Sequence, residues 1–176
     1  MYRSNAHIAL QQIEAAHHQT TLMHEEVALF NRLTIALNFG SAHDVRAAIE
    51  ALPKGTPDYL FLYAPLVDLL DAPEESIEFL LELADDPTRE WPYKYETIAL
   101  LLAYLRRPQE SFRVFMNELQ YTSIRYGSLW FPVMTDVRRL PEFKQFLIDV
   151  KLDDYWRKYG WSNFCRPIGE ADFVCD

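Results

Sequence analysis

Long apolar segments, glycine, cysteine and basic residues are all scarce in this chain of 176 residues. The longest apolar run, Ile98–Leu105, falls far short of the ~18 residues that a membrane-spanning helix needs. The N-terminal segment also lacks the continuous apolar region of a secretory signal peptide. These absences favour a cytoplasmic protein that does not enter a membrane.

Basic residues are outnumbered by acidic ones, 17 to 26, and the formal net charge is −9. Nucleic-acid binding depends on clustered Lys and Arg side chains that neutralise phosphates. The basic segments Arg106-Arg107 and Arg138-Arg139 are too short to form such a surface. We therefore expect no direct nucleic-acid partner.

Only two cysteines are present, Cys165 and Cys175. A cytosolic location favours a reduced pair, and a bridge that closes a short loop between them is the alternative. A nucleophilic role for Cys165 would need a neighbouring base, but no histidine follows His43 in the sequence. We expect Cys165 to be buried and inert.

Sequence signatures of catalysis and cofactor binding are also missing. None of the patterns GxxxxGK(S/T), GxGxxG, GxSxG and HExxH occurs. A candidate metal-binding cluster is interrupted by a predicted helix break at residues 19–21; its members are His17, His18, His24, Glu25 and Glu26. The carboxylates between Glu74 and Asp86 fall on the outer face and at the end of a predicted helix. We therefore predict a protein that is not an enzyme and holds neither metal nor cofactor.

The feature that organises the chain is an internal repeat. Residues 66–81 align without a gap on residues 101–116, 35 positions further on, and apolar residues meet apolar residues along the alignment. A period of this length is typical of stacked pairs of helices. The identical pairs are Leu66/Leu101, Leu70/Leu105, Pro73/Pro108, Glu75/Glu110 and Ser76/Ser111.

Helical spacing of apolar residues extends over most of the chain. Pro65 falls inside one predicted helix and is expected to kink or shorten it. Sustained strand alternation occurs nowhere, so the predicted fold class is all-α. The predicted helices cover residues 5–18, 22–39, 44–52, 58–70, 73–84, 93–106, 108–119, 140–150 and 152–159.

The predicted architecture is an α-solenoid of antiparallel helix hairpins over residues 1–120. Helix 5–18 precedes three pairs, at about 22–52, 58–84 and 93–119. Residues 121–176 follow as a capping segment, which opens with a looser zone at 121–136. Apolar and aromatic residues of this segment are predicted to cover the last hairpin: Phe143, Phe146, Leu147, Tyr155, Trp156 and Phe164.

The repeat resembles the tetratricopeptide repeat, in which small residues let the two helices of a pair approach closely. The matching positions are Ala64 and Ala99 in the first helices and Ser76 and Ser111 in the second. The chain departs from the pattern in the spacing of pair 22–52. It also has alanine for the usual glycine, and where the repeat has its early tryptophan it has Leu60 and Tyr95.

The C-terminal segment looks like the closing segment of many bacterial tetratricopeptide-like proteins. The chain departs from that pattern at Lys151, where a glycine is usual, and at Ser162-Asn163, where Pro-Asp is usual. The resemblance implies a bacterial protein whose relatives carry signalling domains, such as class III nucleotide cyclases and winged-helix transcription regulators. The matching residues are Pro141, Phe143, Leu147, Leu152, Tyr155, Trp156, Arg157, Gly160, Phe164, Cys165 and Arg166.

In the resembled family the first helices of the pairs line a concave binding surface. Its acidic and aromatic character here would suit a peptide with basic and apolar side chains. The alternative is that the first hairpin, or a second copy of the chain, covers this face. Counted from Ala64 and Ala99, the outward positions are Asp58, Phe61, Leu62, Asp68, Leu69, Tyr93, Glu96, Thr97, Leu100 and Tyr104.

These observations predict a non-enzymatic scaffold or adaptor domain that binds a peptide or helix of a partner protein. Apolar surface left uncovered at the N-terminal end would also support a homo-oligomer. The alternative is a regulatory or sensory module of a bacterial signalling protein, with a small ligand held between helices. A hydrolytic enzyme would need a catalytic constellation that the sequence does not offer.

Overall fold

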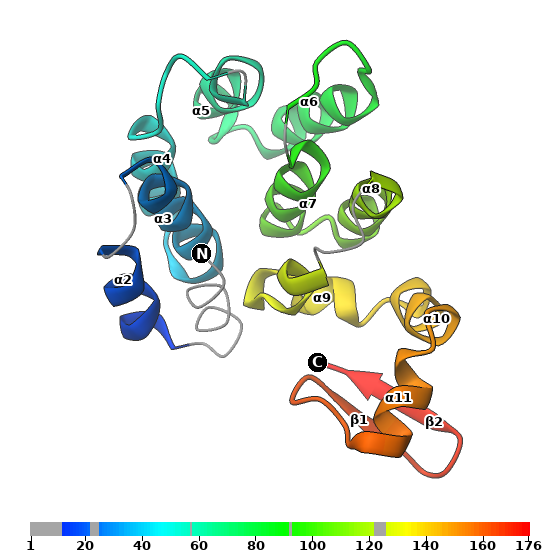
Figure 1. The fold of residues 1–176 in the computed structure, drawn as a ribbon. Helices are drawn as coiled ribbons and strands as arrows, with labels where there is room; N and C mark the ends of the chain where they lie inside the picture. The colour runs from blue at the N-terminus through cyan, green and yellow to red at the C-terminus, as the bar shows by residue number, and fades with distance from the viewer. Residues whose placement is uncertain (1–11, 22–24, 57, 92, 122–125) are drawn as a thin grey trace.

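The computed structural model describes residues 12–21, 25–56, 58–91, 93–121 and 126–176 (Figure 1). This part of the chain is mostly helical and has one small antiparallel sheet, so the expected all-α class is confirmed. Within the described ranges, no helix is both long enough and apolar enough to cross a membrane.

The helices lie close to the positions that the periodicity predicts. The α-helices are α2 (Ile13–Thr21), α3 (Glu25–Phe39), α4 (Ala42–Glu50), α5 (Ala64–Leu69), α6 (Pro73–Asp85), α7 (Lys94–Tyr104), α8 (Pro108–Tyr121), α9 (Thr135–Arg138), α10 (Pro141–Asp149) and α11 (Leu152–Tyr159). The other elements are the π-helix η1 (Tyr59–Tyr63), the 3-10 helices η2 (Tyr126–Trp130) and η3 (Pro132–Met134), and strands β1 (Cys165–Ile168) and β2 (Asp172–Cys175). The break predicted at 19–21 is wrong, because α2 continues through it. Residues 5–11 of the first predicted helix lie outside the described residues.

Pro65 divides the helix that was predicted over residues 58–70. The chain forms the wide turns of η1 up to Tyr63, and the N–H of Ala64 donates to the carbonyl of Tyr59. Pro65 then stands in the first turn of α5, where its missing N–H leaves no helical hydrogen bond unmade. The expected interruption thus takes the form of a change from π-helix to α-helix.

Each α-helix from α2 to α8 packs against the next one along the chain (Figure 1). Between α7 and α8, the hydroxyl of Ser111 donates to the carbonyl oxygen of Ala99 at 2.7 Å. Both residues are fully buried, as is Ser76 in α6. Small side chains therefore permit close contact between neighbouring helices at positions that the repeat singles out.

The segment after α8 returns to the earlier helices. η3 packs against both α3 and α7, and α3 also contacts α7 directly. The backbone N–H of Val133 donates to the side-chain oxygen of Asn38 in α3 at 3.0 Å. Residues 126–134 were expected only as part of a loose connection. Instead they help to cover one side of α7.

The capping segment packs on α8 through aromatic contacts. Phe112 of α8 lies 5.9 Å from Phe143 and 6.1 Å from Phe146, both on α10, measured between ring centroids. Trp156 and Leu147 are also buried. Tyr155 does not take part as expected, because 57% of its surface is exposed on the outer side of α11.

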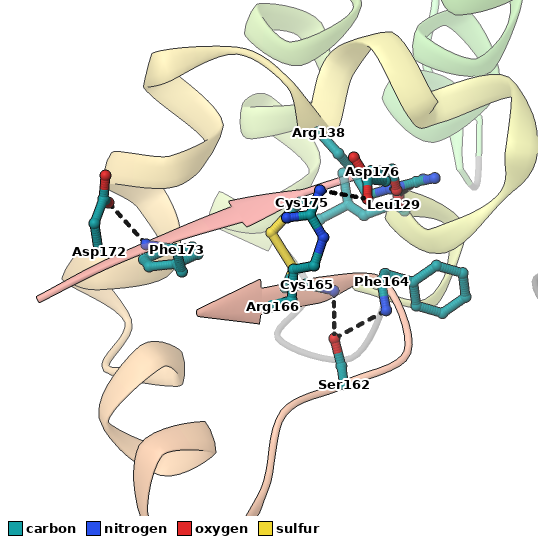
Figure 2. Close-up of a disulfide and its surroundings, with 10 residues drawn as sticks. All are labelled: Leu129, Arg138, Ser162, Phe164, Cys165, Arg166, Asp172, Phe173, Cys175 and Asp176. Atoms are coloured by element: carbon teal, nitrogen blue, oxygen red, sulfur yellow. Dashed lines mark hydrogen bonds and ion pairs between the residues drawn. A yellow bond between two sulfur atoms is a disulfide. The ribbon is translucent and has the colours of Figure 1, made fainter. Parts of the chain in front are cut away.

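The end of the described chain forms a β-hairpin, which the sequence pattern did not predict. β1 and β2 pair antiparallel, with Cys165 opposite Cys175. The two cysteines form a disulfide (Figure 2), so the expectation of a reduced pair is wrong in this structure. Both are buried, and their pairing follows from the hairpin register, which places their side chains on the same face.

Candidate functional site

The candidate partner-binding face was predicted on η1–α5 and α7. Six of its eight principal positions retain accessible surface: Asp58, Phe61, Asp68, Tyr93, Glu96 and Tyr104. Thr97 is also partly accessible, and the side chain of Leu69 lies outside the described residues.

Leu62 and Leu100 are buried, with 0% and 7% of their surface exposed, which differs from the outward placement expected of them. Other helices pack on the elements that carry this face. α4 packs against α5, while α3 and η3 pack against α7. Leu62 and Leu100 therefore belong to the core, and the candidate face is narrower than the sequence predicted.

Tyr63, which sequence reasoning did not single out, joins the two elements of this face. It is buried and shares a hydrogen bond with Thr97 of α7. Its ring lies 6.5 Å from that of Phe30 in α3. Burial, and secondly the charge of Asp58, raises the pKa of the Tyr63 phenol, so the hydroxyl keeps its proton at neutral pH. Tyr63 therefore links η1 to α3, which itself packs against α7.

The start of α7 is fixed by Lys94, a buried lysine with only 1% of its surface exposed. Its ammonium donates to the carbonyl oxygen of Asp86 at 2.5 Å and lies 3.6 Å from a carboxylate oxygen of Glu90. Partners of this kind allow a buried charge to be tolerated. They hold the turn that presents Tyr93 and Glu96.

A pocket of about 360 Å³ lies at the C-terminal end of α7. Tyr104 is the predicted contact residue that lines it, and burial raises the pKa of its phenol. Its walls come from three parts of the chain: the turn between α3 and α4, the end of α7, and η3 with α9. The lining residues are Leu37, Asn38, Gly40, Ala103, Tyr104, Arg106, Pro132, Val133, Thr135, Asp136 and Arg139.

The α3–α4 wall of the pocket is held by local geometry. A Cβ atom on Gly40 would lie 2.8 Å from the carbonyl oxygen of Ala36 and 2.9 Å from Cβ of Asp44, so glycine is required there. Ser41 then caps α4: its hydroxyl accepts from the N–H of Asp44, whose carboxylate accepts from the N–H of Ser41. The Ser41 hydroxyl, and secondly the Ser41 N–H, donate to the carboxylate of Asp44, lower its pKa and keep its charge at the helix cap.

Two arginines and one aspartate give the pocket its charge. Nη1 of Arg106 lies 3.3 Å from one carboxylate oxygen of Asp136, and Nη1 of Arg139 lies 3.2 Å from the other. Arg106 lies just after the end of α7 and has a φ of 63°. This left-handed conformation turns the following chain away from the helix axis. Together the three side chains leave one net positive charge in a chain whose overall charge is −9. The arrangement is suited to hold an anionic group.

A second pocket, of about 300 Å³, lies beside the first and shares Pro132 and Thr135 with it. Buried Arg138 lines it and donates to three carbonyl oxygens: those of Leu129 and Asp176, each at 2.7 Å and both drawn in Figure 2, and that of Phe131 at 2.8 Å. Its remaining terminal nitrogen donates to the hydroxyl of Thr135 at 3.0 Å. Arg138 therefore fastens the end of β2 to the segment before α9, and we assign it a structural role.

The candidate metal and nucleophile sites gain no support. Among the residues that the structure describes, no three His, Cys, Asp or Glu side chains gather to hold a metal ion. His17 and His18 lie exposed on α2, and His24 lies outside the described residues. Cys165 is bonded to Cys175 and has no thiol to act as a nucleophile.

Comparison with known proteins gives no relative: no family model, curated protein or solved structure matches this chain. The resemblance to tetratricopeptide repeats therefore rests on the residues of the repeat itself. Membership of that family remains a prediction.

Proposed function

We propose that this chain is a non-enzymatic protein-interaction module, an α-solenoid of the tetratricopeptide type with a C-terminal cap. It would bind a peptide or helix of a partner protein across η1–α5 and α7. The observation that supports the proposal is that α3 lies against both elements: the ring of Phe30 is 6.5 Å from that of Tyr63 in η1, and α3 also packs against α7. In this proposal, the accessible aromatic and acidic residues of η1–α5 and α7 form one binding surface.

The chemistry of this surface favours a partner with basic and apolar side chains. Asp58, Asp68 and Glu96 supply negative charge, which steers association and selects against acidic segments along that stretch. Phe61 supplies a partly buried ring, over which Arg89 lies at 5.8 Å. A basic side chain of a partner would find a similar cation–π contact at the exposed ring of Tyr93.

A regulatory module that holds a small ligand is the second candidate function. The pocket beside Tyr104 favours it, because it lies between helices and its volume is within the range of small-ligand sites. A ligand that binds only the folded protein would raise its melting temperature. Thermal-shift screening against metabolites and nucleotides therefore separates this function from peptide binding.

The disulfide bears on where such a module would work. A cytoplasmic bacterial protein was predicted, but cytosolic thiols are kept reduced. Cys165–Cys175 fits an oxidising compartment better. Alkylation of free thiols, followed by mass measurement of the protein taken from its own host, decides between the two locations.

The contact surface is tested by a double substitution, Phe61→Ala with Tyr104→Ala. We expect the partner that copurifies with the unaltered protein to bind at least about tenfold more weakly, because aromatic anchors carry much of the binding energy at interfaces. Tyr155→Ala with Tyr159→Ala is the matched control, since these two neighbouring rings are exposed on α11. If the variant with Phe61→Ala and Tyr104→Ala binds the partner as tightly as the unaltered protein, the surface is wrongly assigned.

A further inference from the structure

We infer that the pocket beside Tyr104 binds a carboxylate of the partner peptide, clamped between Arg106 and Arg139. The inference rests on the proposed function, because it names the chemical group that this end of the surface selects. The occupant would be a Glu or Asp side chain in a segment that is otherwise basic and apolar.

The two guanidinium groups are held in place but are not saturated. Each meets Asp136 through Nη1. Within the described part of the chain, their Nε and Nη2 atoms make no other hydrogen bond. A guanidinium presents its N–H groups as a planar fork that matches a carboxylate. Asp136 lies between two such forks at one pocket.

The ion pairs already present do not oppose a ligand strongly. The side chains of Arg106 and Arg139 are 84% and 57% exposed, and that of Asp136 is 44% exposed. Exposed pairs of this kind contribute little to stability, so their rearrangement costs little. Arg106 and Arg139 carry two positive charges and Asp136 carries one negative charge. An added carboxylate would therefore make the group of charges neutral.

The remaining walls fit the rest of an acidic side chain. Leu37, Ala103 and Val133 offer apolar surface for its methylene groups, and the phenol of Tyr104 keeps its proton because burial raises its pKa. Asp44, on the neighbouring helix cap, is engaged with Ser41. These hydrogen bonds hold the carboxylate of Asp44 at the helix cap, so it does not compete with a ligand for the two arginines.

The occupant is a peptide carboxylate because its two oxygens match the N–H groups of the guanidinium forks that Asp136 leaves unused. Asp136 shows that a carboxylate fits between the two guanidinium groups with one oxygen toward each. Phosphate would also interact with arginine, so a phosphate-bearing ligand is retained as an outcome that the experiment must distinguish.

The test selects binders from a phage-displayed library of random dodecapeptides with the full chain as bait. The best binder is then synthesised and its Kd measured by fluorescence anisotropy. We expect an acidic residue at one fixed position of the selected peptides, and roughly tenfold or greater loss of affinity when it is replaced by its amide. The double substitution Arg106→Gln with Arg139→Gln should cause a similar loss of affinity. In that variant, replacing the acidic residue of the peptide by its amide should lower the affinity no further.

Arg113→Gln with Arg166→Gln is the matched control, since it removes the same charge from two exposed arginines elsewhere. Peptides that bind equally well to the Arg106/Arg139 variant would overturn the inference and leave peptide binding intact. Failure to select any peptide would overturn both. A rise in melting temperature with inorganic phosphate that the Arg106/Arg139 variant loses, without acid-dependent peptide binding, would assign the pocket to a small anion and overturn the inference.

Discussion

Replacing both cysteines by alanine should lower the free energy of unfolding by about 2.5–3 kcal/mol, the chain-entropy value for a loop of this length. The disulfide joins residues ten positions apart. In a chain of this size, that change corresponds to a fall in melting temperature of roughly 5–12 °C. Alanine is preferred to serine because Cys165 and Cys175 are buried, and a serine hydroxyl there would need a new hydrogen-bond partner.

The hairpin depends on this bond because its strands are short. β1 and β2 have four residues each, and an isolated two-stranded hairpin is at best marginally stable. Arg157 adds support, since it donates to the carbonyl oxygens of Glu170 and Ala171 in the turn. Phe173 packs against Trp161, over whose ring the guanidinium of Arg157 also lies. Without the disulfide, these contacts alone would have to hold the segment between Cys165 and Cys175 in its folded conformation.

The measurement is thermal unfolding of the unaltered chain and of the alanine variant, each with and without a reducing agent. Reduction should lower the melting temperature of the unaltered chain nearly to that of the variant, and leave the variant unchanged. The comparison is clean because the chain has only two cysteines. Equal melting temperatures in all four samples would mean that the bond does not stabilise the fold.

Apolar periodicity was enough to locate the longer helices, because each must bury one face, but it missed α9 and the 3-10 helices η2 and η3. The bounds of α6, α7 and α8 differ from the predicted ones by one or two residues. The hairpin escaped this reasoning since its strands are too short to show an alternating pattern, and β1 buries only Cys165. A cysteine pair ten residues apart was the one available signal for it.

The candidate site was only partly predictable, for a different reason. Helical spacing shows which residues share a face, but not what covers that face. Leu62 and Leu100 lie in the core, and α7, which carries Leu100, packs against α3 and η3, two elements distant from it in the sequence. Arg106 and Arg139 converge only because η3 returns to α7, and as separate short basic segments they give no sign of a shared pocket.

Arg138→Met should destabilise the protein by about 3 kcal/mol, a value between the cost of one lost charged hydrogen bond and that of a broken buried network. Arg138 has 4% of its surface exposed. Burial lowers the pKa of its guanidinium to about 10, so it is charged at neutral pH and its charge is costly to bury. The hydrogen bonds to the carbonyl oxygens of Leu129, Phe131 and Asp176 offset that cost, and these oxygens would lose their donor in the variant.

Arg138→Lys and Arg139→Met separate the causes of this effect. Lysine keeps the positive charge but lacks the planar fork that reaches several carbonyl oxygens at once, so most of the destabilisation should remain. Arg139 is the adjacent arginine, and its exposed side chain should be replaceable within about 0.5 kcal/mol. Urea unfolding of the three variants gives the comparison. Full stability of Arg138→Lys would assign the role to charge alone, and full stability of Arg138→Met would mean that the end of β2 is not held by this residue.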